Sequence, residues 1–88
     1  MPYEVLFHRE ASKELLGLPG PIYRRIQAEL IKLQTEPRPR RAAKLRGHAD
    51  LWRLRFGRYR VIFHVDDSEH VVTVVRVALR SEDTYRRL

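Results

Sequence analysis

The sequence contains no cysteine. This absence excludes disulfides, thiolate nucleophiles and cysteine-based zinc sites, and it suits a reducing compartment, so we expect a cytoplasmic protein. The four histidines (His8, His48, His64 and His70) show no metal-ligand spacing and no accompanying carboxylate cluster. We therefore expect neither a bound metal nor any other cofactor. A phosphate-binding glycine loop and a nucleophilic serine motif are also missing.

Long apolar runs are absent as well. The longest falls far short of the roughly 20 residues that a membrane-spanning helix needs. The opening residues, MPYEVLFHRE, have neither the cationic lead nor the apolar stretch of a signal peptide. We therefore expect a soluble intracellular protein without a membrane partner. Its 88 residues, 43% of them hydrophobic, predict one globular domain over residues 1–88.

Acidic residues are scarce in one part of the chain. Residues 38–60 include nine basic side chains and one acidic side chain, Asp50, which gives this segment a net charge of +8. The basic residues are Arg38, Arg40, Arg41, Lys44, Arg46, Arg53, Arg55, Arg58 and Arg60. The other 65 residues hold nine basic and ten acidic side chains, a net charge of −1. Such asymmetry favours an anionic partner, and arginine suits forked contacts with phosphate.

The first half of the sequence predicts a strand and two helices. The short strand covers Tyr3–Phe7. From about Arg9, apolar residues recur at helical spacing until the Gly17–Pro21 segment stops the first helix. Pro21 can open a second helix, because its missing N–H does no harm in the first turn. The apolar stripe of that helix is Ile22, Ile26, Leu30 and Leu33, and Pro37 follows its end.

The second half predicts a meander of strands. A basic connector, residues 37–47, leads to strands over Asp50–Phe56, Tyr59–Val65 and Val71–Leu79. The first turn is Gly57-Arg58, of type II′, and the second begins at Asp66. A last helix is expected over Ser81–Leu88. The order β-α-α-β-β-β-α predicts an α+β domain with two N-terminal helices on one face of a mostly antiparallel sheet.

The first hairpin of this meander predicts a phosphate site. With Gly57-Arg58 as the turn, Arg55 lies opposite Arg60, and two like charges about 5 Å apart destabilise a hairpin unless an anion lies between them. The core face holds Trp52, Leu54, Phe56, Tyr59, Val61 and Phe63, and the opposite face holds Arg53, Arg55, Arg60 and His64. Alternation adds Arg80 to the basic face. The alternative is a solvated surface with only loose affinity for polyanions, but the absence of interleaved glutamate favours a site.

These residues resemble a known family. The segments KLRG (44–47), LWRLR (51–55) and GRYRVIF (57–63), with Arg80, Tyr85 and Arg86, resemble the RelE toxins of bacterial and archaeal toxin–antitoxin systems. The likeness extends to the opening strand, the ASKELLGLP helix (11–19) and the second helix, and so covers essentially the whole chain. The series is specific for the RelE/ParE superfamily and less decisive between its branches.

The resemblance implies a RelE-like fold and a metal-free endoribonuclease that cuts mRNA in the ribosomal A site. It also implies a cognate acidic antitoxin as partner. In this family the ribose 2′-OH attacks the adjacent phosphate and leaves a 2′,3′-cyclic phosphate and a 5′-OH. The reaction needs a proton acceptor, cations for the charge growing on phosphorus, and help for the leaving oxygen.

By position, the resemblance assigns catalytic roles to Arg53, Arg55, Arg60, Arg80 and Tyr85. Contacts to RNA and rRNA are expected from Arg38, Arg40, Arg41, Lys44, Arg46 and Arg58. The best-known relative has lysines at the second-strand positions, one of them proposed as the base, and arginine cannot release a proton in this range. The spacing from Arg80 to Tyr85 is also one residue shorter than in that relative. We therefore expect Tyr85 to accept the 2′ proton or to orient the 2′-OH, with little contribution from His64.

Two other functions stay open. A ParE-like toxin would poison DNA gyrase without cutting RNA, although Arg60, Arg80 and Tyr85 together favour the nuclease. A non-catalytic basic RNA-binding module is the third reading, and the arginines at 53 and 55 count in its favour.

Overall fold

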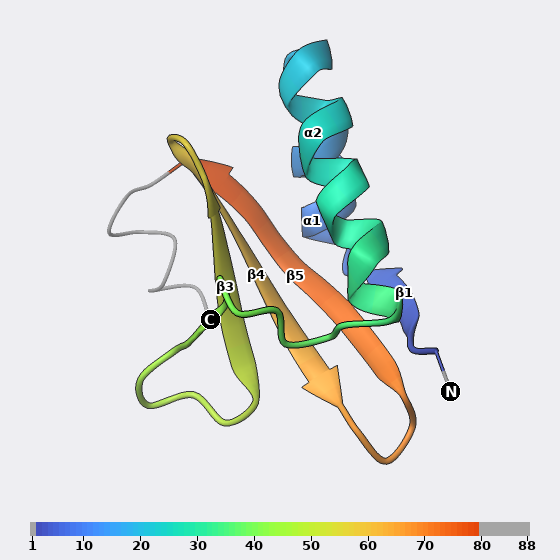
Figure 1. Ribbon diagram of the computed structural model, residues 1–88. Coiled ribbons are helices and arrows are strands. Elements are labelled where there is room, and N and C mark those ends of the chain that lie inside the picture. Colours follow the sequence, from blue (N-terminus) through green and yellow to red (C-terminus); the bar gives the residue numbers. More distant parts are fainter. Residues whose placement is uncertain (1, 80–88) are drawn as a thin grey trace.

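The chain forms two layers, with both α-helices on one face of a twisted sheet (Figure 1). The computed structural model describes residues 2–79. In chain order the elements are β1 (Glu4–Phe7), α1 (Arg9–Leu16), α2 (Gly20–Ile31), the 3-10 helix η1 (Lys32–Gln34), β2 (Ala43–Lys44), β3 (Leu51–Phe56), β4 (Tyr59–Asp66) and β5 (Val71–Leu79). No helix among the described residues is long and apolar enough to cross a membrane.

The sheet has the strand order β1-β5-β4-β3-β2. Strand β1 is parallel to β5, and the other three pairings are antiparallel. The α+β class predicted from the sequence is therefore confirmed, as are the two helices and the three strands of the meander. The two-residue strand β2 was not predicted, and it lies inside the expected connector. The expected Ser81–Leu88 helix lies outside the described residues.

The helices form where their apolar spacing and caps predict them. His8 caps α1, its Nδ1 accepting a hydrogen bond from the Glu10 N–H at 3.3 Å. Pro21 lies in the first turn of α2. Together, α1, α2 and η1 turn Ala11, Leu15, Ile26, Leu30 and Leu33 toward the sheet, where all five are buried. The stripes expected from the sequence are thus the packed faces.

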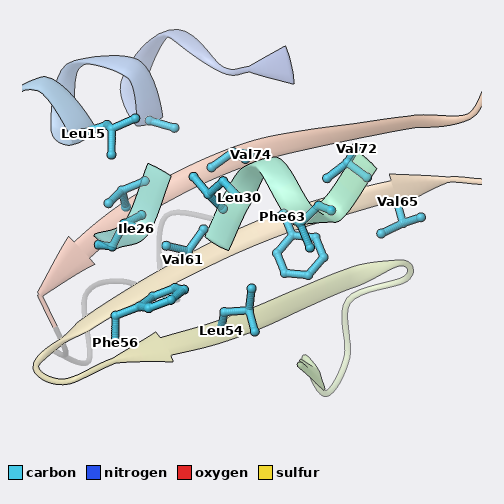
Figure 2. Close-up of a cluster of buried hydrophobic side chains, with 13 residues drawn as sticks. Leu15, Ile26, Leu30, Leu54, Phe56, Val61, Phe63, Val65, Val72 and Val74 are labelled. Carbon is cyan, nitrogen blue, oxygen red and sulfur yellow. The ribbon is translucent and has the colours of Figure 1, made fainter. Parts of the chain in front are cut away.

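The core lies between the helices and one face of the sheet (Figure 2). Figure 2 shows Leu54 and Phe56 of β3, Val61, Phe63 and Val65 of β4, and Val72 and Val74 of β5 on the helix side. Phe63 and Val61 are fully buried. Burying a side chain of this size stabilises the fold by about 1.5–3 kcal/mol relative to exposure. This packing fixes which hairpin face meets the helices and which stays available.

The hairpin register is the one that the sequence predicts. Arg55 pairs with Arg60, and Phe56 pairs with Tyr59. Gly57 has a φ of 59°, and Arg58 is not among the residues with positive φ, which fits a type II′ turn. One irregularity was not predicted: the pairing of β4 with β5 shifts between Ile62 and Phe63.

Helix α1 covers the edge of β5 that β1 leaves open. Because β1 pairs only as far as Val74, the Val77 N–H beyond it needs another partner. Glu14 Oε1 accepts that N–H at 2.9 Å. The same carboxylate binds Arg76, with Nε and Nη2 donating at 3.0 and 2.8 Å. Glu14 thereby ties the Arg76 guanidinium to α1.

Candidate functional site

A shallow depression lies on the sheet face opposite the helices. It has a volume of about 410 Å³, and its lining residues come from β2, β3, β4 and the loop between β2 and β3. They are Lys44, Leu45, Arg46, His48, Arg53, Arg55 and Arg60. We call this depression the basic hollow. Of these seven described lining side chains, five are cationic and none is acidic.

Strand alternation builds the floor of the basic hollow. Since Leu54 and Val61 point into the core, Arg53, Arg55 and Arg60 must point to the other face. Arg55 is exposed, whereas Arg60 is only 7% exposed. Holding two cations directly opposite each other disfavours the pairing of the strands, and an anion that both contact relieves the repulsion. Forked guanidinium donors match the oxygens of a phosphate.

The loop between β2 and β3 forms the wall of the basic hollow. Its first turn closes with a hydrogen bond from the His48 N–H to the Leu45 carbonyl, at 3.4 Å. Gly47 has a φ of 79°, the left-handed value that the third residue of a type II turn requires. Leu45 is 8% exposed, and its N–H donates to the Leu51 carbonyl at 2.9 Å. At the far end, the Asp50 carbonyl accepts from the Val65 N–H at 3.2 Å. The wall is therefore fixed at both ends.

The remaining predicted RNA contacts lie elsewhere. The Arg38 guanidinium lies 5.5 Å from the centre of the Trp52 ring, and that of Arg41 lies 5.1 Å from the centre of the Phe56 ring. Both rings belong to the core face, so these arginines are on the helix side of the sheet. Arg40 is exposed on the same connector, in a depression that Glu29 and Lys32 share. Arg58 is exposed at the hairpin turn. The charge of residues 38–60 is thus divided between two faces.

Ion pairing explains why the connector follows the helix side. Arg38 binds Asp67 through two hydrogen bonds of 2.9 Å, and the Tyr3 hydroxyl donates to the same carboxylate at 2.7 Å. Arg38 and Tyr3 together lower the pKa of Asp67 to about 2. The bond to Asp67 in turn raises the pKa of Tyr3. Arg41 adds a hydrogen bond of 2.6 Å to the Arg55 carbonyl. These contacts fasten residues 38–41 to the sheet.

Among the described residues, the polar side chains that line the basic hollow are five cations and one imidazole. Within residues 2–79, no three or more histidine or acidic side chains lie close enough together to hold a metal ion. Lys44, Arg46, Arg53, Arg55 and Arg60 can bind and neutralise a phosphate. His48 is the one imidazole among the described lining residues, and imidazole is the side chain that most often moves protons in catalysis. Sequence reasoning missed it, although the Gly47 turn beside it was a usable signal.

Comparison with known proteins identifies the family. Residues 5–84 match the sequence profile described as the ParE toxin of the type II toxin–antitoxin system parDE. The chain belongs to the RelE/ParE superfamily of toxins. A search among curated proteins found no match.

Solved RelE structures are similar over nearly the whole toxin. The RelE–RelB complex of Pyrococcus horikoshii has 36% sequence identity and a TM-score of 0.81, with 93% of this chain and 99% of that one covered. A RelBE toxin–antitoxin complex of Mycobacterium tuberculosis has 32% identity and a TM-score of 0.78, covering 91% and 100%. A double mutant of the free Escherichia coli RelE toxin has 27% identity and a TM-score of 0.83, covering 98% and 93%. The RelE-like fold expected from the sequence is confirmed.

Of the catalytic residues that the resemblance assigns, the structure brings Arg53, Arg55 and Arg60 together in the basic hollow. Lys44 and Arg46, expected to contact RNA, lie in the same hollow. Arg80 and Tyr85 lie outside the described residues.

Proposed function

We propose that this toxin is a ribosome-dependent mRNA endoribonuclease that works without a metal and inhibits translation. The observation that carries the proposal is the convergence of five cationic side chains in the basic hollow, three of which have catalytic roles assigned by the resemblance to RelE toxins. Similarity to RelE toxins over more than 90% of the chain supports it. The ribosome, with its rRNA and A-site mRNA, is then the target, and the cytoplasm is the place of action.

The basic hollow suits the charge changes of RNA transesterification. When the 2′ oxygen attacks the phosphate, negative charge grows on the phosphoryl oxygens. Arg60, which is nearly buried and held by β4, is the donor best fixed before the reaction, and fixed donors stabilise a transition state most. Arg55 faces it across the strand pair and can contact a second oxygen. Lys44 and Arg46 would bind neighbouring phosphates of the mRNA.

An acidic antitoxin is the second partner that we propose. The RelE toxins of P. horikoshii and M. tuberculosis were solved in complex with their antitoxins. An acidic segment would neutralise the basic hollow. An amphipathic segment of the same antitoxin would fill an apolar groove of about 310 Å³ between β1, α1 and α2, lined mainly by Val5, Phe7, Leu15, Leu16, Tyr23, Leu30 and Ile31. Leu16 and Ile31 are 72% and 56% exposed there, which is costly without a partner.

Gyrase poisoning is the competing function, because the matching profile is named for ParE toxins. Expression without antitoxin separates the two. The nuclease should arrest translation and leave mRNA with new 5′ ends inside coding regions, with purified gyrase unaffected by the toxin. Gyrase-dependent DNA breaks with intact mRNA would overturn the proposal. Growth arrest with neither mRNA cleavage nor DNA breaks would favour the non-catalytic RNA-binding reading.

A further inference from the structure

The basic hollow has an unusual composition for a site of RNA cleavage. The reaction needs a group that accepts the 2′ proton, and guanidinium groups cannot serve because they keep their protons at any physiological pH. Arg53, Arg55 and Arg60 are therefore limited to binding charge. His48 is the one imidazole among the lining residues. We propose that His48 is a catalytic residue that accepts the proton of the attacking 2′-OH, an inference that rests on the proposed nuclease function.

The local structure holds His48 in the wall of the basic hollow. The Leu45–His48 turn, with Gly47 at a φ of 79°, directs the chain back toward β3. The buried Leu45 side chain holds the start of this turn against the protein. His48 is partly buried, and its N–H is held by the hydrogen bond to the Leu45 carbonyl. A base held on a fixed wall can meet a phosphodiester that the arginines bind on the floor.

The other three histidines are placed differently. His8 caps α1 through its Nδ1. The ring of His70 lies 4.9 Å from that of Tyr3, near the Asp66–Ser68 turn. His64 shares the basic face of β4, but it is paired with Leu51 and Thr73 and is not among the residues that line the basic hollow. It therefore serves as a matched control.

The step balances without an oxidant or a metal. The 2′ oxygen forms a bond to phosphorus as its proton passes to the imidazole of His48. The bond between phosphorus and the 5′ oxygen breaks, and its electron pair leaves with that oxygen. The 5′ oxygen takes a proton from water, and the hydroxide left behind takes the proton from the imidazolium. The products are a 2′,3′-cyclic phosphate and a 5′-OH, and His48 is again neutral.

This assignment predicts a definite pH dependence. His48 must be neutral to accept a proton, so the cleavage rate falls as acid protonates it. Among the residues that the structure describes, the charged groups that share the basic hollow with it are Lys44, Arg46, Arg53, Arg55 and Arg60. Tyr85, a phenol, would keep the role of orienting the 2′-OH.

The test is single-turnover cleavage of mRNA on programmed ribosomes, with the full-length toxin, between pH 5.5 and 8.5. His48→Gln should lower the rate by about 10²–10⁴-fold, remove the acidic limb of the profile and leave ribosome binding unchanged. His64→Gln should behave as wild type. Added imidazole should restore part of the activity of His48→Ala, which a merely structural role would not allow.

Two outcomes would overturn the inference, and they are distinguishable. If wild-type toxin cuts mRNA and His48→Gln cuts within about threefold of it with the same pH profile, His48 is not the base, and Lys44 and Tyr85 are the remaining candidates. If the wild-type toxin itself cuts no mRNA at any pH, the proposed function fails and the role of His48 fails with it.

Discussion

Removing the Glu14 carboxylate should destabilise the toxin far more than removing a carboxylate whose cationic partners are exposed. Glu14 accepts hydrogen bonds from Arg76 and from the Val77 N–H, and the side chains of Glu14 and Arg76 are only 23% and 18% exposed. Glu14→Ala leaves the Val77 N–H without an acceptor, at a cost of about 1 kcal/mol, and strips a partly buried guanidinium of its ion pair, at about 1–1.5 kcal/mol more. We expect a total of about 2 kcal/mol. For a domain of this size that corresponds to a fall in Tm of roughly 10 °C.

The assay is urea unfolding followed by circular dichroism, with Glu29→Ala as the control. Glu29 pairs with Lys32 at 3.3 Å and with Arg41 at 4.0 Å, but the side chains of these cations are 69% and 54% exposed, so this loss should cost less than about 0.5 kcal/mol. Both substitutions place alanine in a helix, which cancels the change in helix propensity. Equal destabilisation by the two variants would refute the role given to Glu14 at the edge of β5.

Three further predictions concern the connector, the wall of the basic hollow and the antitoxin. Because the pKa of Asp67 is lowered from 3.8 to about 2 in the folded protein, its contribution to stability is present above pH 4 and lost as the pH falls toward 2. Urea midpoints measured over that range should therefore fall less for Asp67→Asn than for wild type. Gly47→Ala should lower the free energy of unfolding, measured with urea, by about 1–2 kcal/mol because alanine disfavours the positive φ. Gly17 has a φ of −83°, so Gly17→Ala should change the free energy of unfolding much less. Equal losses in the two variants would contradict this prediction. The association rate with the acidic antitoxin should fall at least about tenfold from low to high salt. Leu16→Glu should instead raise the dissociation rate. An association rate independent of salt would refute electrostatic steering.

Local patterns were enough to predict most of this fold. Alternation from Leu51 to Phe63 and the Gly57 turn gave the hairpin register, since a slip by one residue would expose Leu54 and Val61. Helical spacing gave the buried faces of α1 and α2. The floor of the basic hollow followed from the same alternation. The two-residue strand β2 was missed because it is too short to show a pattern.

Contacts between distant residues could not be predicted. Arg38 lies on the helix side because it pairs with Asp67, 29 positions later, and Arg76 is tied to Glu14 across 62 positions. The sequence of the connector has no periodicity that indicates these partners. The division of the basic segment between two faces of the sheet could therefore not be predicted. The approach of His48 to the arginines depends on how the Gly47 turn folds back, which again is tertiary structure.

The central claim is that the basic hollow cuts RNA, and single-turnover cleavage of mRNA in the ribosomal A site by an Arg60 variant tests it most directly. Arg60→Gln should lower the rate at least about 10²-fold with its circular dichroism unchanged. Arg25→Gln removes the same charge from the exposed surface of α2 and should cut at the wild-type rate. A 2′-deoxy nucleotide at the cut site should prevent cleavage by the wild type and by both variants. Cleavage by Arg60→Gln at the wild-type rate, or cleavage of the 2′-deoxy substrate, would contradict the account.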